Sequence, residues 1–492
     1  MKYLKFFIVA LLGVSLVACH DKLDVVPSDS LADGNAFETI NDYEMGVLGV
    51  YQAMRADSYY GGFFMIVPDV LSDNLLICKD GRTTWRAFHE WTANSTTFGT
   101  AGFWGSAYVG INNANQVISR LQNNNPFEVG TPAHSRSLNL LGEALALRAM
   151  LHFDLVRVYG EAYINASSNG LGIPYMHAPA VGEPARHNTA EVYQFIRQDL
   201  EAALELYNGN NNNARLNARA IPALMARVAL YMEDWQNAHD YAMMAVAGDG
   251  SDITGPNLFN DIWRVNSGPG IDTEVIFRIA ITNSDPELLG NVYGQGQSNT
   301  AGTSDGNRPE YVPSYSYYQL FEDNDMRKHA YFMTGTYSGT QYNSVSKFFG
   351  RFDSPAVNKT DAIIIRTPEM YLTAAEALYR LGQYDEALTM LDLLRAKRYV
   401  QFESGNETGI ALINEIYKQR RLELGMEGHR FFDLKRKGLG VERDDFGDEY
   451  NGEGLPANAR SLEANHARFL LPIPQGEINS NSNMVQNPGY SQ

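Results

Sequence analysis

The sequence predicts a mostly α-helical protein, and three observations support this fold class. Apolar residues recur at helical spacing along most of the chain, and the tracts between them are rich in Gly, Asn and Ser. The clearest strand pattern is the β-branched run TEVIFRIAI, residues 273–281. We therefore expect a helical scaffold with long loop-rich insertions and a few short strands.

Two stretches carry the clearest helical stripes. Apolar residues recur at Leu141, Leu145 and Met150 along a helix that we expect to end at Gly160, because glycine is a common C-terminal cap. The next helix is expected to begin at a Thr189 cap, since a threonine side chain can accept a hydrogen bond from the first turn.

Two later stretches resemble each other, which indicates an internal repeat. Residues 226–246 and 374–398 share Ala-Leu-Tyr, a short turn, an aromatic residue and then Ala238 or Ala387. Small alanines let two antiparallel helices approach closely, as in tetratricopeptide repeats, where neighbouring helix pairs bury what one pair cannot. Degenerate helix pairs are expected at roughly 36–120, 139–207 and 215–247.

The first residues have the pattern of a bacterial lipoprotein signal. Lys2 and Lys5 precede the apolar run 6–17, which is too short for a comfortable transmembrane helix. The run ends in Leu-Val-Ala-Cys, which resembles a lipobox that is cleaved before Cys19. Acyl chains on Cys19 would hold the protein on a membrane without a spanning helix. The alternative is a plain secretory signal.

Charge and cysteine content restrict the partners and the bonds. The net charge of −18 opposes binding to phosphate backbones, so we expect no nucleic-acid partner. The only cysteine besides Cys19 is Cys78, so lipidation of Cys19 leaves no intramolecular disulfide. A lone thiol of this kind is typical of a small buried apolar residue.

The strongest candidate for catalysis is GMEGHRFFDLKRKG, residues 425–438. On a helical wheel Arg420 points into an apolar stripe, where a buried guanidinium needs a carboxylate such as Glu423 or Glu427. Arg430 and Asp433, three residues apart, form a natural pair on the following helix. We therefore interpret the stretch as structural. The alternative is an acid–base site, which needs an unpaired group beside open space.

No metal or cofactor site is expected, because no HExxH, CxxC or P-loop pattern occurs. His429 has no second histidine at metal spacing and is expected on a helix surface. The sequence therefore predicts a protein that is not an enzyme and uses no cofactor.

Aromatic residues in polar loops are the candidate ligand contacts. Flat rings stack on the apolar faces of sugars, while amides and charged groups take the hydroxyls. The alternative for each ring is ordinary core packing, which we expect for Trp104 and Trp235 on helical patterns. The candidates are Trp85, Trp91, Tyr293, Tyr59, Tyr60, Arg82, Asn94, Arg308 and Tyr315.

Seven motifs in order along the chain resemble the SusD/RagB family of Bacteroidetes outer-membrane nutrient-binding lipoproteins. They are the lipobox, FWGSAYVGINNANQVI (103–118), EALALRAMLHFDLVRVYG (143–160), EVIFRIA, RTPEMYLTAAEAL (366–378), RRLELGMEGHRFFDLKRKG (420–438) and LLPIPQGEINSNSNMVQNPGY (470–490). Where the family usually has an acidic residue before the Arg pair, this chain has Gln419, which puts one structural ion pair in doubt.

The resemblance implies a SusD-like right-handed tetratricopeptide-type scaffold. It implies a signal peptide at 1–18 and one domain over 19–492, with an N-terminal part at about 19–250 and a C-terminal RagB/SusD part at about 270–492. It also implies a non-catalytic, lipid-anchored protein, exposed on the outer membrane, that passes an oligosaccharide to a SusC-like TonB-dependent barrel.

Three other functions stay open at this stage. A RagB-like member would bind an oligopeptide, for which Arg82 and Arg308 would suit peptide carboxylates. A pure scaffold would bind a partner protein in its tetratricopeptide groove, and a hydrolase is disfavoured by the paired carboxylates. The sequence leaves the nutrient, any structural calcium and the stoichiometry with the barrel undecided.

Overall fold

The structure is a computed structural model that describes residues 36–78, 84–165, 170–265, 268–285, 288–294, 309–337, 340–350, 359–444 and 457–491. The chain divides into two compact units, Met1–Met45 and Gly46–Gln492. In the first unit the rings of Phe37 and Tyr43 lie 5.0 Å apart. Helix α2 (Ile40–Met54) begins in the first unit and ends in the second. Cys19 lies outside the described residues.

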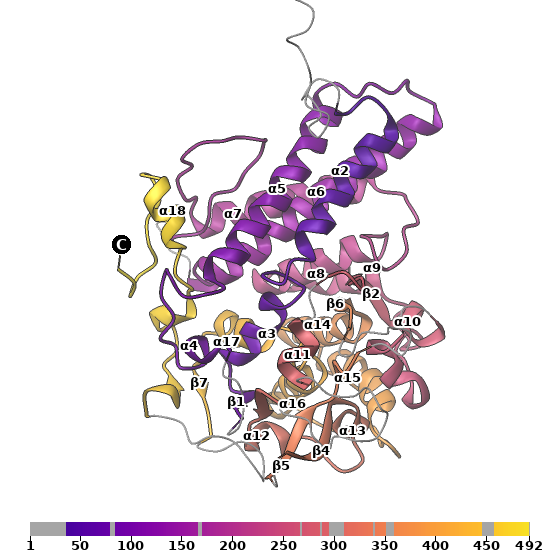
Figure 1. Cartoon of the computed structure of the whole chain (residues 1–492). Coiled ribbons are helices and arrows are strands. Elements are labelled where there is room, and N and C mark those ends of the chain that lie inside the picture. Colours follow the sequence, from indigo (N-terminus) through magenta and orange to yellow (C-terminus); the bar gives the residue numbers. More distant parts are fainter. Residues whose placement is uncertain are drawn as a thin grey trace, which may run out of the picture. The chain divides into compact units, whose positions relative to one another are not determined.

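Helices make up most of the second unit (Figure 1). In the first part of this unit they are α3 (Phe63–Val70), α4 (Arg86–His89), α5 (Thr100–Asn123), α6 (Pro132–Tyr159), η1 (Tyr163–Asn165), α7 (Thr189–Leu206), α8 (Ala220–Tyr231) and α9 (Trp235–Ala245). Further on come η2 (Pro256–Trp263), α10 (Pro269–Glu274), α11 (Leu288–Gly294), α12 (Tyr315–Tyr318), α13 (Met326–Tyr331), α14 (Thr367–Arg380), α15 (Tyr384–Arg398), α16 (Gly409–Glu423), α17 (Arg430–Arg436), η3 (Ala457–Ala459), η4 (Ala467–Phe469) and α18 (Gln475–Ser480).

The strands of the described residues form four antiparallel pairs. They are β1 (Leu75–Ile77) with β3 (Tyr311–Pro313), β2 (Val275–Ile279) with β6 (Ala362–Arg366), β4 (Phe332–Tyr337) with β5 (Thr340–Val345), and β7 (Val441–Glu442) with β8 (Ser461–Leu462). The strand expected within 273–281 is therefore confirmed as β2, and the mostly α fold class is confirmed as well.

The two repeat copies form helical hairpins, as predicted. Helix α8 packs on α9, α14 packs on α15, and α14 also contacts α9 (Figure 1). Ala238 and Ala387 are fully buried between these helices, where a larger side chain would hold the backbones apart. Trp235, expected in the core, is only partly buried at the start of α9.

Two helix ends can be compared with the sequence prediction. Helix α6 ends at Tyr159 with Gly160 as its cap, although Gly160 has extended backbone angles (φ −96°, ψ 160°) rather than left-handed ones. A Cβ on Gly160 would lie 2.7 Å from a methyl carbon of Val156, so glycine is required by close packing. Helix α7 is capped by Asn188, which forms a capping box with Glu191, so the Thr189 cap was wrong by one residue.

Candidate functional site

The carboxylates of the 420–438 region are buried and paired with arginines. The Nε of Arg420 donates to both carboxylate oxygens of Asp433, at 3.0 and 2.9 Å. Arg436 joins Asp433 to Glu376, at 2.8 and 2.7 Å. Arg420 is 1% exposed and Asp433 4%, so neither of them lines an open cleft. The interpretation of this stretch as structural is supported by these contacts.

The individual partners differ from the predicted ones. Arg420 binds Asp433 instead of Glu423 or Glu427. Arg430 binds Asp73, with two N–O distances of 2.7 and 2.8 Å, instead of Asp433. The tertiary fold explains the difference, because it places Asp73, which follows α3, beside α17. The sequence does not show that these two segments are close.

A second buried cluster is centred on Glu423. This carboxylate accepts hydrogen bonds from Arg366 at 2.8 Å, from Arg398 at 3.0 Å and from Arg327 at 3.3 Å. Arg327 also donates to the side-chain oxygen of Gln419 at 2.8 Å, so an amide stands where the family usually has an acidic group. The cluster contains the cations Arg327, Lys347, Arg366 and Arg398 and the carboxylates of Glu274, Asp325, Glu423 and Glu427.

His429 is buried at 5% exposure, so its expected place on a helix surface was wrong. Burial lowers its pKa to about 3, although Glu369 opposes this shift, and the ring is therefore neutral at pH 7. Burial likewise holds the pKa values of His89 and His152 well below the ordinary range. Arginine neighbours lower the pKa values of several buried carboxyl groups despite the opposing effect of burial, among them Glu369, Glu376, Glu423 and Asp433.

These shifts predict a loss of stability in acid. The unfolded chain protonates its histidines below about pH 6.5, and the folded protein keeps three of them neutral. The unfolded chain protonates its glutamates near pH 4.5, whereas in the folded protein the arginine-paired carboxyl groups stay ionised at that pH. Asp69 has the opposite effect on the free energy of unfolding. Burial raises its pKa to about 6, so the folded protein binds this proton more readily than the unfolded chain as the pH falls. We expect the free energy of unfolding, measured by denaturant titration, to fall below pH 6.5 and more steeply below 4.5. A constant value between pH 7 and 4 would contradict the assignment.

Two of the three regions that supplied candidate ligand contacts, 80–98 and 292–318, lie side by side where the structure describes them. Strand β1 pairs with β3, so Ile77 lies opposite Tyr311. The backbone N–H of Thr84 donates to the Glu310 carboxylate at 2.8 Å, and the rings of His89 and Tyr311 lie 6.1 Å apart. The structure therefore brings the segment around Trp85 next to the segment that leads to Tyr315.

Most of the candidate rings are buried, so the expectation that they face solvent was wrong for these residues. Tyr59 and Tyr60 stack at 4.6 Å, and both hydroxyls donate to Asp154, at 2.5 and 2.7 Å. A polar partner inside the protein lets a tyrosine from a polar loop become a core residue. Tyr293 is also fully buried and stacks on Phe348 at 5.4 Å.

The two candidate tryptophans are core residues as well. Trp85 is 2% exposed and contacts the rings of Phe63 and Phe88. Trp91 is 6% exposed, its indole N–H donates to the carbonyl oxygen of Leu71 at 3.1 Å, and the guanidinium of Arg443 lies 4.1 Å from its ring centre. Trp104 is buried, in agreement with its core interpretation.

Asn94, Tyr315 and Phe98 are among the side chains of these segments that face solvent. Asn94 is exposed, and its amide oxygen accepts hydrogen bonds from Thr96 and Thr97, which leaves its NH₂ group without a partner among the described residues. Tyr315 is 48% exposed. Phe98, which was not among the candidates, is 80% exposed and stacks on Trp85 with 5.9 Å between ring centres and 19° between planes.

Phe98 forms the outer layer of an aromatic stack built on Trp85. Gly99 follows with φ 94°, and a Cβ there would lie 2.7 Å from the Trp85 ring and 2.9 Å from Phe63. Glycine therefore lets the chain turn closely over the stack. The sequence signal was present, because a phenylalanine in the polar tract TANSTTFGT cannot be covered by its neighbours. Arg82 and Arg308 lie outside the described residues.

The described residues give two further results about metals and membranes. They contain no group of three or more His, Cys, Asp or Glu side chains placed to hold a metal ion. None of their helices combines the length and the apolar character needed to cross a bilayer.

Two family models match the chain. The model described as "SusD family" matches residues 247–490, and the model described as "Starch-binding associating with outer membrane" matches residues 24–230.

Individual relatives match over nearly the whole chain. SusD-like protein P2 from Formosa agariphila is 27% identical and spans 99% of this chain and 100% of that relative. The crystal structure of a SusD superfamily protein from Bacteroides vulgatus superposes on this chain with a TM-score of 0.79, and the two sequences are 26% identical. The match covers 93% of this chain and 100% of that one. A laminarin-binding SusD-like protein, at 23% identity, has the same fold with a TM-score of 0.71 over 92% of this chain and 100% of that one. The chain belongs to the SusD/RagB family.

Proposed function

We propose that this protein binds an oligosaccharide without cleaving it and delivers it to a SusC-like TonB-dependent barrel. The observation that carries the proposal is the Phe98 ring, which is 80% exposed and lies flat on Trp85. An exposed flat ring supported from below is the surface on which the apolar face of a sugar stacks. The family description of starch binding and outer-membrane association supports the same class of ligand and the same location.

The polar contacts of this site are proposed to come from Asn94 and Tyr315. The NH₂ group of Asn94 is available as a donor on the same loop as Phe98, and the half-exposed Tyr315 hydroxyl can donate or accept. Pairs of donors and acceptors around a ring match the hydroxyls of a neutral sugar better than the single charge of a peptide terminus. An oligopeptide ligand is the alternative that the experiment below also addresses.

The place of the protein in the cell is proposed from its N-terminus and its family. A lipid on Cys19 would hold it on the outer membrane, with the folded chain exposed at the cell surface next to the barrel. Most of the buried carboxylates described above are paired with arginines, as in the pair of Arg227 and Glu369 at 2.6 Å, which supports binding without hydrolysis.

Phe98→Ala tests the site directly. We expect it to weaken binding of maltohexaose or laminarihexaose by about tenfold or more, because truncating an aromatic anchor costs about 1–3 kcal/mol. Titration of tryptophan fluorescence measures this affinity, since the Trp85 ring stacks against Phe98 in an offset arrangement. The recovered ligand is expected to be intact by chromatography.

Tyr384→Ala is the matched control, because Tyr384 is a 49% exposed ring on α15 outside these loops. This variant is expected to bind as the wild type does. Equal affinities of the wild type and Phe98→Ala would remove Phe98 from the site. Binding of a tripeptide in place of both hexaoses would overturn the sugar assignment, and shortened product would overturn the non-catalytic role.

A further inference from the structure

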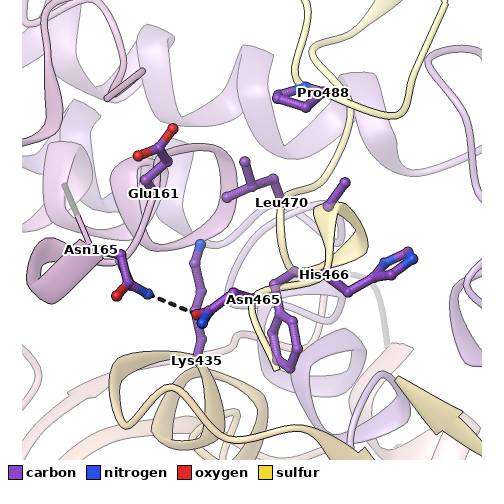
Figure 2. Close-up of a pocket in the computed structure, with 10 residues that line it drawn as sticks. Glu161, Asn165, Lys435, Asn465, His466, Leu470 and Pro488 are labelled. Carbon is purple, nitrogen blue, oxygen red and sulfur yellow. Dashed lines mark hydrogen bonds between the residues drawn. The ribbon is translucent and has the colours of Figure 1, made fainter. Parts of the chain in front are cut away.

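A cavity of about 410 Å³ lies between the segment that follows α6 and the C-terminal segment around η4 (Figure 2). Its volume falls within the range of about 300–1,000 Å³ that is usual for small-molecule pockets. Its wall combines polar groups, among them Glu161, Asn165, Lys435 and Asn465, with apolar ones such as Leu470. The Phe98 stack is not part of this lining.

Lys435 supplies a fixed donor to the cavity. The side chain is 8% exposed, and its ammonium donates to the carbonyl oxygens of Arg157 and Gly160, both at 2.7 Å, at the end of α6. Figure 2 shows the nitrogen of Lys435 directed between Glu161 and Leu470. A protonated amine has three N–H groups, so one remains for a ligand. Burial lowers the pKa of Lys435 to about 7, with Glu161 opposing and Arg157 reinforcing the shift.

Glu161 supplies an acceptor that has no partner. Its carboxylate forms no hydrogen bond and no ion pair with any described residue, Lys435 included. An ammonium and a carboxylate therefore line one cavity without neutralising each other by direct contact. This differs from the clusters around Glu423 and Asp433, where the opposite charges are joined directly.

Two amides also lie on the polar side of the cavity, together with His466. The NH₂ group of Asn165 donates to the amide oxygen of Asn465 at 2.7 Å, which joins two wall segments 300 residues apart in the sequence (Figure 2). After this bond Asn465 keeps its NH₂ group, and Asn165 keeps its carbonyl oxygen. Asn465 has a left-handed backbone angle (φ 61°), a conformation that asparagine tolerates better than most residues.

The apolar side is rigid. Phe469 is 4% exposed and stacks on Phe431, with 4.8 Å between ring centres and 15° between planes. Leu470 is 7% exposed beside it, and Pro488 adds a further apolar surface. A ligand in this cavity would therefore meet a fixed apolar wall on one side and separate donors and acceptors on the other.

The chemistry of the wall selects among ligand classes. A carboxylated or phosphorylated ligand would be attracted by Lys435 but repelled by Glu161, and a cationic ligand would meet the reverse, so a ligand of a single charge leaves one of the two groups opposed. A purely apolar ligand would leave both charges unsolvated. A neutral polyol satisfies all of these groups, because each hydroxyl can donate to a carboxylate and accept from an ammonium or an amide.

We propose that this cavity is a second sugar-binding site, which takes a neutral terminal hexose of the oligosaccharide with its hydroxyls between Lys435, Glu161 and the two asparagines. The inference rests on the proposed oligosaccharide-binding function and adds a site away from the exposed aromatic stack. It also restricts the ligand to oligosaccharides with an uncharged end.

Two substitutions test the cavity without removing the Lys435 contacts that hold the end of α6. Ala162→Trp fills the space from its rim, and Glu161→Gln removes the unpartnered charge with little change in shape. Matched controls are Ala411→Trp on the exposed face of α16 and Glu205→Gln near the end of α7, both outside the cavity lining. Melting temperatures are expected to match the wild type for all four variants.

Calorimetry with maltohexaose and laminarihexaose gives the outcome. We expect both cavity variants to bind the preferred hexaose at least about tenfold more weakly, since a hydrogen bond to a charged group is worth about that factor. The controls are expected to be unchanged. A wild type that binds, together with cavity variants of equal affinity, would overturn the cavity site and leave the proposed function standing.

A wild type that binds neither hexaose would instead overturn the proposed function together with the cavity site. Trialanine binding that Ala162→Trp abolishes would show that the cavity holds a zwitterion and overturn the sugar assignment. Titration with methyl glucoside, a single sugar unit, is expected to show binding that Ala162→Trp loses and Ala411→Trp keeps, because Ala162 lines the cavity and Ala411 does not. The reverse pattern would overturn the site.

Discussion

Glu423→Ala is expected to destabilise the protein by about 3–5 kcal/mol, because it removes one partner of a buried ion cluster. The Glu423 carboxylate is 0% exposed and binds Arg366, Arg398 and Arg327. With it the cluster has as many carboxylates as cations, and without it one positive charge stays buried and uncompensated. The free energy of unfolding from guanidinium titration measures the loss.

The control for this variant is Glu386→Ala, in the first turn of α15. Glu386 is exposed and has no hydrogen-bond or ion-pair partner among the described residues, so its loss is expected to change stability by no more than about 0.5 kcal/mol. If Glu423→Ala unfolded at the same denaturant concentration as Glu386→Ala, the cluster would have no structural role.

The buried ion pairs of residues 420–438 explain why this charged stretch resembled an active site. Helical periodicity placed Arg420 in an apolar face, and its burial agrees with that placement. The partner could not be derived, because short sequence distance favoured Glu423 and Glu427 while the fold supplied Asp433 and, for Arg430, the distant Asp73. Periodicity reports which face of a helix is buried and carries no information about the element that covers it.

The same limit applies to the candidate ligand contacts. Polar neighbours in the sequence suggested that Tyr59 and Tyr60 are exposed, but Asp154 satisfies both hydroxyls inside the protein. For Phe98 the local sequence was sufficient, since no apolar residue in its tract could cover the ring. Loop aromatics thus become core residues where a distant segment provides a cover, and only the tertiary structure shows that segment.

The cavity in Figure 2 illustrates the part that sequence patterns do not reach. Asn165 and Asn465 are separated by 300 residues, and each belongs to a short polar stretch that reads as an ordinary loop. Lys435 belongs to the stretch that we first considered for catalysis, and its neighbours there are buried ion pairs. Its distinct role arises because α17 lies against the end of α6, where two carbonyl oxygens orient the amine.

Trp85→Ala is expected to cost about 3–5 kcal/mol of stability, in addition to weakening ligand binding. The indole is 2% exposed, and it contacts Phe63 at 5.4 Å and supports Phe98 at 5.9 Å. Its N–H has no hydrogen-bond partner in the part of the chain that the structure describes, so Trp85→Phe loses only packing and is expected to stay much closer to the wild type. Phe98→Ala should lose binding while keeping its stability, because its ring is mostly exposed.

Denaturant titration of these three variants, together with their sugar affinities, separates the role of the supporting Trp85 ring from that of the Phe98 ring that contacts the ligand. A Trp85→Ala protein with wild-type stability would mean that the indole is not a core residue, and the aromatic stack would then lose its rigid base.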